Sequence, residues 1–133
     1  MSSAAEAIPA EVRTEVIDYG RLIACIIEVE GNATTATGGN LGFTLATWRQ
    51  FEPHLPYYLS QNKPVAAGVA RKALASYSAR RAKEGHVVTV EFLAQCWLSG
   101  YTGARRLFAN GANPEYGRRV ANLYRDAEFR LRP

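Results

Sequence analysis

Cysteine and histidine are scarce in this sequence, and their scarcity argues against several kinds of site. The chain of 133 residues has two cysteines and two histidines. Cys25 and Cys96 are too few and too far apart for a disulfide framework or a zinc site, and both lie in apolar stretches where buried thiols are expected. His54 and His86 lie in expected loops and should face solvent. The sequence also has no phosphate-binding glycine loop and no Ser–His–Asp arrangement, so we expect neither a metal nor a cofactor.

Long apolar runs are also missing. No run approaches the roughly 20 residues that a membrane-spanning helix needs, so we expect no membrane span. The first stretch, "MSSAAEAIPAEVRTEV", has no basic segment followed by an apolar one and therefore does not resemble a secretory signal. The localisation stays open: the protein stays inside the cell, leaves it by another route, or has a native signal that is missing from this chain.

The remaining composition is that of an ordinary globular domain with an excess of basic residues. Hydrophobic residues make up 47% of the chain and charged residues 21%. A chain of 133 residues is long enough for one domain with a hydrophobic core. The net charge of +4 and the pI of about 9.3 favour an anionic partner, such as nucleic acid, a cell-wall polymer or a membrane surface.

Apolar residues recur at helical spacing along most of the chain, which predicts a mainly α fold with a small loop or minor β element. We expect one domain over residues 1–133, with residues 1–8 flexible. Weak strand signals occur only in "HVVTV" and around the glycine-rich loop of residues 31–42. In the first half of the chain we expect a helix from Pro9 to an interruption at Gly20, a second that Gly31 ends, and a short one over residues 44–51. A long helix should run from Asn62 to Gly85, and the next should be capped by Thr89 and end at Gly100. A short helix within residues 102–110 and a last one opened by Asn113 and Pro114 should follow.

The stretch "IIEVEGN", residues 26–32, places two glutamates at the end of an apolar helix. The residues three, four and seven positions before Glu30 are all isoleucines, so Glu30 extends an apolar stripe toward the core or a cleft edge. Glu28 follows a more polar flank that includes Arg21. Partial desolvation of a carboxylate favours its protonated form, which is the form that a general acid needs. The plainer alternative is that Glu30 only ends a helix and faces water.

The segments "ACIIEVEGN", "LGFTLATW", "FLAQCWLSGYTG" and "NPEYGRRVANLY" occur in an order that resembles the lysozyme-like superfamily. This superfamily includes lytic transglycosylases, goose-type lysozymes and the bacterial relatives of invertebrate-type lysozymes. The resemblance covers roughly residues 20–125 and concerns the pattern more than the sequence. It implies a lysozyme-like helical domain that acts on peptidoglycan or a related glycan, and therefore action outside the cytoplasm.

The resemblance carries the catalytic acid of the family onto Glu30, because "VEGN" is similar to the family's "VESGGN" with residues removed. Glu28 is the competing assignment, since the alignment can also start from the first glutamate. Gly42, Phe43 and Thr44 stand where the family has its glycine and glutamine segment. The turn that the family builds from tryptophan, asparagine and two glycines corresponds to Trp97, Leu98, Ser99 and Gly100, and the tyrosine of the last helix corresponds to Tyr116.

This chain departs from the family pattern at two polar positions. Thr44 replaces the glutamine, and Leu98 or Ser99 replaces the asparagine. Both groups line the sugar cleft in the family, and leaving a sugar group without its partner costs about 1–3 kcal/mol each. The threonines of the loop and Thr44 itself are able to substitute for them. Otherwise the chain keeps the fold and has lost or changed the activity, in which case it binds glycan or a protein partner.

A mechanism with one acid fits the sequence better than one with two. Glycosidases generally use two carboxylates, but no Asp or Glu occurs between Gly31 and Phe51. In the lytic transglycosylases that the chain resembles, one glutamate protonates the glycosidic oxygen and then acts as base, while a hydroxyl of the substrate closes an anhydro ring. We therefore expect Glu30 to act alone.

Aromatic residues close to these segments are candidates for stacking on sugar rings. Trp48 follows the glycine-rich loop and Tyr101 follows Gly100, so these two are expected at the cleft rim. The expected substrate-binding residues are thus Thr44, Trp48, Ser99, Gly100, Tyr101 and Tyr116.

The basic residues support a different alternative. Arginines and lysines crowd the long helix and the last third of the chain, which is compatible with a basic helical protein that binds nucleic acid. Interspersed acidic residues favour a solvated surface instead, and nucleic acid is the weaker of the two partner hypotheses. The sequence does not assign an oligomeric state.

Overall fold

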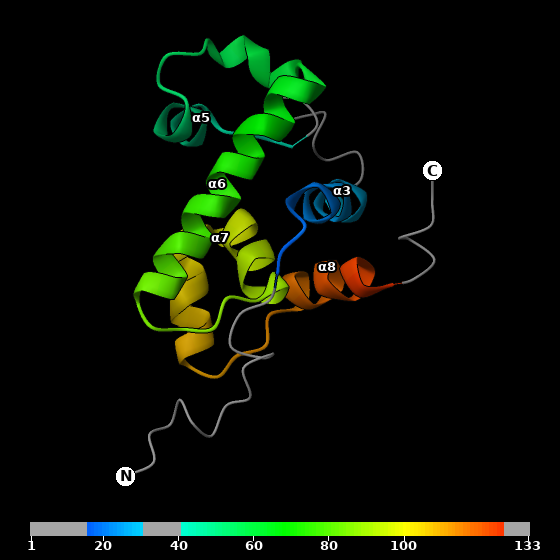
Figure 1. Ribbon diagram of the computed structural model, residues 1–133, viewed down its shortest axis with the longest axis vertical. Helices are drawn as coiled ribbons and strands as arrows, with labels where there is room; N and C mark the ends of the chain where they lie inside the picture. Colours follow the sequence, from blue (N-terminus) through cyan, green and yellow to red (C-terminus); the bar gives the residue numbers. More distant parts are fainter. Residues whose placement is uncertain (1–15, 31–40, 127–133) are drawn as a thin grey trace.

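The computed structural model describes residues 16–30 and 41–126, and this part of the chain is mainly helical and contains no strand. Most of the helix expected from Pro9, the segment 1–8 and most of the glycine-rich loop lie outside the described residues; the expected end of that helix was wrong, because residues 16–18 are not helical. Figure 1 shows the long helix α6 running along the molecule, with α5 on one side and α3, α7 and α8 on the other. The elements are α3 (Tyr19–Glu30), α5 (Leu45–Phe51), the 3-10 helix η1 (Tyr57–Gln61), α6 (Lys63–Lys83), α7 (Val90–Ala109) and α8 (Glu115–Arg125).

Side-chain caps determine where the helices begin. Asn62 accepts a hydrogen bond from the Val65 amide at 3.0 Å, and Thr89 accepts one from the Phe92 amide at 3.1 Å. The cap at Thr89 was predicted from the sequence, and Asn62 was predicted as the start of its helix. The predicted interruption at Gly20 was wrong, because α3 begins one residue earlier. Asp18 sets this boundary by accepting a hydrogen bond from the Arg21 amide at 3.0 Å.

Gly100 divides α7 into two segments. Its backbone has φ 79° and ψ 164°, a conformation that only glycine adopts easily, and both segments on either side are helical. The predicted end of a helix at Gly100 and the further helix after it therefore match the backbone. The change of direction puts the residues before Gly100 and those after it on different parts of the molecule.

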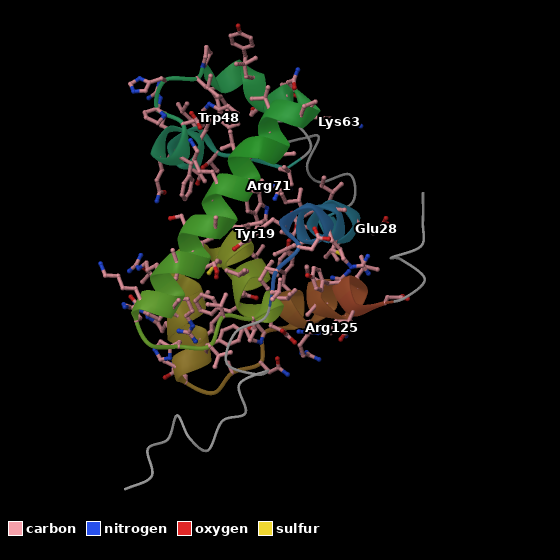
Figure 2. All side chains as sticks on the ribbon, in the orientation of Figure 1. Tyr19, Glu28, Trp48, Lys63, Arg71 and Arg125 are labelled. Atoms are coloured by element: carbon pink, nitrogen blue, oxygen red, sulfur yellow. The ribbon has the colours of Figure 1, made fainter. Side chains whose placement is uncertain are left out.

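The core lies where α3, α6, α7 and α8 meet. Leu22 and Ile26 of α3 are fully buried against it, together with Leu74 of α6 and Leu93 of α7. Trp48 anchors α5 to the core and donates its indole N–H to the Leu55 carbonyl at 2.9 Å. Figure 2 shows Trp48 and Arg125 on opposite sides of the molecule. Among the described helices, none combines the length and the apolar character needed to cross a membrane.

Helix α8 lies very close to the start of α7. A Cβ atom added at Gly117 would lie 2.6 Å from the backbone oxygen of Glu91, so only glycine permits this approach. The Glu91 side chain then pairs with Arg125 through two contacts, Nη1 to Oε2 at 2.8 Å and Nη2 to Oε1 at 3.1 Å. Glu91 therefore contacts α8 near both of its ends: its backbone meets Gly117 near the start, and its side chain pairs with Arg125 at the end.

Gly117→Ala should lower the free energy of unfolding by about 1–3 kcal/mol, because its methyl group would push α8 away from α7. Helix propensity alone predicts the opposite sign. The matched control is Gly68→Ala in α6, where an added Cβ meets nothing within 4 Å. This control should stabilise the protein by about 0.5–1 kcal/mol. Urea denaturation measures both values, and a stabilised Gly117→Ala would contradict the close approach.

The Glu91–Arg125 pair should make stability depend on acid pH. Burial favours the neutral form of Glu91, but the hydrogen bonds from Arg125 prevail and hold its pKa below the usual 4.5. The unfolded chain therefore binds the proton more readily, so the pair stabilises the fold above about pH 4.5 and this contribution is lost as pH falls through the folded pKa. Glu91→Gln should be less stable than wild type at pH 7, and the difference should shrink toward pH 3. A difference that stays constant over this range in urea denaturation would show that the charge of Glu91 does not matter.

Candidate functional site

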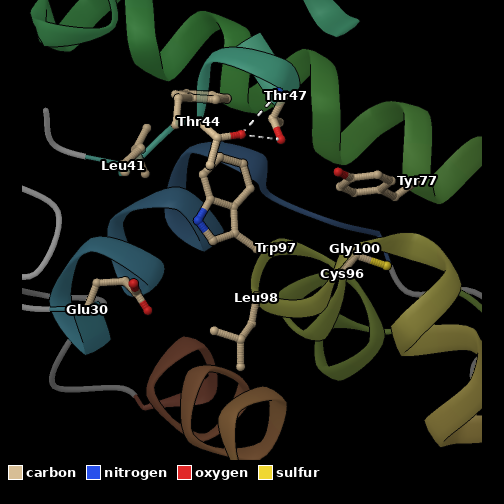
Figure 3. A pocket seen from close by; sticks show the side chains of 11 residues that line it. Glu30, Leu41, Thr44, Thr47, Tyr77, Cys96, Trp97, Leu98 and Gly100 are labelled. Carbon is tan, nitrogen blue, oxygen red and sulfur yellow. Dashed lines mark hydrogen bonds between the residues drawn. The ribbon is translucent and has the colours of Figure 1, made fainter. Parts of the chain in front are cut away.

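A pocket of about 390 Å³ opens between the end of α3, the start of α5 and the segment of α7 before Gly100. Figure 3 shows the carboxylate of Glu30 pointing into it from one side and the threonines of α5 lying across from it. Helix α6 contributes Tyr77 to the far wall. The lining residues are Glu30, Leu41, Gly42, Phe43, Thr44, Thr47, Tyr77, Cys96, Trp97, Leu98 and Gly100.

Glu30 occupies the last position of α3, and its place follows from the apolar stripe of this helix. Ile23 and Ile26, seven and four residues earlier, are buried, and Glu30 itself is only partly exposed. Glu28 is exposed and lines a separate surface depression with Arg119 and Asp126. The two glutamates of "EVE" thus face different surroundings, and only Glu30 lines the pocket.

Tyr116 lies beside Glu30 at the start of α8. Its hydroxyl is buried and makes no hydrogen bond of ordinary geometry within the described part of the chain. Burial raises the pKa of Tyr116, and the nearby carboxylate of Glu30 raises it further. The hydroxyl therefore stays protonated at neutral pH, and a small movement of either side chain would let it donate to Glu30.

Thr44 does not offer a free hydroxyl to the pocket. As the cap of α5, its Oγ1 accepts a hydrogen bond from the Thr47 amide at 3.2 Å. The same oxygen lies 3.0 Å from Oγ1 of Thr47. If Thr44 donates its proton in this contact, Thr47 keeps its own hydroxyl proton for a ligand. Thr44 was expected to bind a ligand with its hydroxyl. Of the two threonines, Thr47 is the one whose hydroxyl is better placed to do so.

The wall across from Glu30 is largely apolar. Phe43 and Trp97 meet edge to face with their ring centroids 5.2 Å apart, and Leu41 adds a third apolar side chain. Leu98, one of the two residues that the resemblance sets against the family's asparagine, is 56% exposed and presents its methyl groups to the pocket. The pocket is therefore polar at Glu30 and Thr47 and apolar between them.

Four of the expected binding residues do not line the pocket: Tyr116, which lies beside Glu30, and Trp48, Tyr101 and Ser99. Trp48 is 0% exposed and belongs to the core, so its expected place at the cleft rim was wrong. Tyr101 is 5% exposed and donates its hydroxyl to Glu84 at 2.6 Å, away from the pocket. Ser99 does not line the pocket, and its hydroxyl donates to the Gln95 carbonyl at 3.0 Å. Gly100 does line the pocket, as Thr44 and Glu30 do.

Several pocket residues were not expected from the sequence. Tyr77 could have been found, because it ends the apolar stripe of α6. Thr47 carried no signal beyond its position three residues after a helix cap. Cys96 lies in the wall, but burial raises the pKa of its thiol to about 12, so it is no nucleophile at neutral pH.

Glu30 is the only carboxylate among the described residues that line the pocket. Residues 31–40, which follow it directly, include no Asp or Glu. The arrangement offers one proton donor and acceptor, with the buried hydroxyl of Tyr116 behind it. Such a set can perform general acid and general base catalysis in sequence but not a mechanism that needs a second carboxylate in the same wall.

The chain was compared with protein-family models, with curated proteins and with solved structures, and none of them matches it.

Tyr116→Phe should raise the free energy of unfolding by roughly 1 kcal/mol, because it removes a buried hydroxyl that has no hydrogen-bond partner among the described residues. The matched control is Tyr57→Phe, whose hydroxyl donates to the Phe43 carbonyl. This control should lower stability by about 1 kcal/mol, since that carbonyl loses its donor. Thermal and urea denaturation test both variants. A destabilised Tyr116→Phe would mean that the hydroxyl already bonds Glu30 or water in the resting protein.

Proposed function

We propose that the chain is a lysozyme-like helical protein that cleaves peptidoglycan or a related glycan with Glu30 as its single acid and base. The observation that carries the proposal is the position of Glu30. Among the residues that the structure describes, it is the only carboxylate lining a pocket assembled from α3, α5, α6 and α7, and it has the protonated hydroxyl of Tyr116 beside it. Both residues are those on which the sequence resemblance places the acid and the tyrosine of the last helix.

In the proposed reaction, Glu30 donates its proton to the oxygen of the glycosidic bond as the bond from that oxygen to the anomeric carbon breaks. A hydroxyl of the same sugar then attacks the anomeric carbon and forms the anhydro ring, and the Glu30 carboxylate takes up the proton of that hydroxyl. The glutamate ends the cycle protonated, as it began, and no second carboxylate or water is consumed. Tyr116 is a positioning residue, because its hydroxyl can stabilise the carboxylate form between the two proton transfers.

The apolar wall supports ring binding more than recognition of hydroxyl groups. Trp97 offers an aromatic surface for a sugar ring, but Leu98 cannot donate or accept a hydrogen bond. With Thr44 committed to capping α5, only the single hydroxyl of Thr47 is left to replace one amide of the resembling family, and the second amide has no direct substitute in the lining. Each missing contact costs about 1–3 kcal/mol of transition-state binding, which is up to about a hundredfold in rate. This feature favours a second candidate, a lysozyme-like domain that binds glycan or a protein partner without cleaving it.

Glu30→Gln should abolish the release of soluble muropeptides from purified peptidoglycan while leaving the fold and sedimentation with peptidoglycan nearly unchanged. Glutamine keeps the shape of the side chain but has no proton to give to the leaving oxygen. The matched control is Glu28→Gln, two residues earlier on α3 and outside the pocket. This variant should reduce activity less than tenfold, since the charge of Glu28 acts only from outside the pocket. Mass spectrometry of the products distinguishes anhydro ends from reducing ends.

An inactive Glu28→Gln with an active Glu30→Gln would assign the acid to the other glutamate. If the wild type also releases nothing but sediments with peptidoglycan, the second candidate is supported and the cleavage proposal fails. Reducing ends in place of anhydro ends would replace the single-acid cyclisation by attack of water.

A further inference from the structure

A cluster of basic side chains lies at the end of α6 and along the segment of α7 after Gly100, outside the pocket. Figure 1 shows these two segments side by side at one end of the molecule. The cluster, named here the α6–α7 basic surface, is made of Arg80, Arg81, Lys83, Arg105 and Arg106. Glu84 is the one carboxylate that the described residues place in contact with it. The local excess of four positive charges equals the net charge of the whole chain, +4, so the rest of the sequence is balanced.

Two of these arginines are held in place by aromatic rings. The guanidinium carbon of Arg80 lies 4.0 Å from the centroid of Tyr101, and that of Arg81 lies 4.0 Å from the centroid of Phe92. Stacking of this kind fixes the plane of a guanidinium and leaves its N–H edges for other partners. The Nε atom of Arg81 is buried and has no hydrogen-bond partner among the described residues. These side chains are therefore organised before any ligand arrives.

Glu84 neutralises only one of the five positive charges of the surface. Its Oε1 accepts the hydroxyl of Tyr101 at 2.6 Å, and this bond is the main reason why the pKa of Glu84 lies below its usual range. Its Oε2 lies 3.5 Å from Nε of Arg80 and 3.6 Å from Nη1 of Arg105, longer than a charge-assisted hydrogen bond. The side chains of Arg80 and Arg105 remain 50% and 47% exposed. Most of their donors are thus open to an external anion.

The geometry points to a flexible, linear phosphodiester polymer of the cell envelope as the ligand of the α6–α7 basic surface. Guanidinium groups match phosphate oxygens with two parallel hydrogen bonds, and five cations on two neighbouring helix segments suit an anion whose charge repeats along a chain. Specific interfaces with duplex DNA bury about 1,000–2,500 Å² of protein surface, or about 600–1,000 Å² for a single small module, and are basic over that area, whereas the basic excess here is confined to two helix segments. The choice of a polymer of the cell envelope rests on the proposed function. The existence of the basic surface follows from the structure alone.

The basic surface adjoins the pocket through aromatic contacts. Tyr77 lines the pocket and stacks on Tyr101 with their ring centroids 6.2 Å apart. Tyr101 in turn carries Arg80 on its ring. A phosphate polymer attached to a glycan strand is therefore able to contact this surface while the strand occupies the pocket.

The test is the binding of fluorescently labelled poly(glycerol phosphate) to the full chain, measured by anisotropy at several salt concentrations. Arg80→Gln/Arg105→Gln should weaken binding at least tenfold at low salt and make the slope of log affinity against log salt less negative by about 1.4, roughly 0.7 for each lost phosphate contact. The matched control is Arg49→Gln/Lys63→Gln, which removes two exposed cations, one on α5 and one at the first residue of α6, where Figure 2 places Lys63. It should change affinity less than threefold.

Equal losses in both double variants would overturn the proposal, because net charge alone would then explain binding. A duplex DNA of matched phosphate number that binds as tightly as the polymer would also overturn it in favour of nucleic acid. If circular dichroism shows that Arg80→Gln/Arg105→Gln does not fold, Arg105→Gln/Arg106→Gln replaces it, since both of its residues are exposed. Glu30→Gln should bind the polymer as wild type does, so a failure of the cleavage proposal leaves this result unaffected.

Discussion

The approach of α8 to the first turn of α7 is the constraint that keeps Tyr116 beside Glu30 at the edge of the pocket. Gly117 meets the backbone of Glu91, and a side chain at this position would force the helices apart. Tyr116 is its neighbour in sequence, so the same contact holds the buried tyrosine hydroxyl near Glu30. The other side of the junction is fixed by Arg21 of α3, whose Nε donates to the Tyr124 carbonyl at 2.6 Å. The end of α3 and the start of α8 therefore stay together as one unit, and the carboxylate and the hydroxyl with them.

Gly100 separates two chemical environments on one helix. Before it, Trp97 and Leu98 face the pocket. After it, Tyr101 turns toward the end of α6, where it supports Arg80 and binds Glu84. A residue with a Cβ atom would strain this backbone, and a continuous helix would rotate Tyr101 out of its place. One glycine thus sets the wall of the pocket and the organisation of the basic surface at once.

Local rules predicted the helices well, because caps and apolar periodicity depend on a few neighbouring residues. Thr89, Asn62 and Gly100 are examples, and the stripe that ends at Glu30 was read from spacing alone. Trp48 and Tyr101 were misplaced because each was assigned from its nearness to a glycine turn, whereas burial depends on elements distant in sequence. Thr44 was assigned by alignment with a polar position and does line the pocket, but alignment gave no sign that its oxygen also caps α5. The close contact between Gly117 and Glu91 could not be predicted, because the spacing of apolar residues along the sequence gives no sign of it.

If the proposed function holds, the pocket makes few specific hydrogen bonds to the sugar but gives the reacting groups a less polar environment. Apolar walls strengthen the electrostatic effect of Glu30 and Tyr116 on a developing charge, since less water screens them. The same walls bind sugar hydroxyls weakly, so affinity for the strand must come from elsewhere. A polyanion held on the neighbouring α6–α7 basic surface would raise the effective concentration of an attached glycan at the pocket without any new contact there. On these two proposals, the α6–α7 basic surface supplies most of the affinity for the polymer. The pocket then has only to position the glycosidic bond that is cleaved.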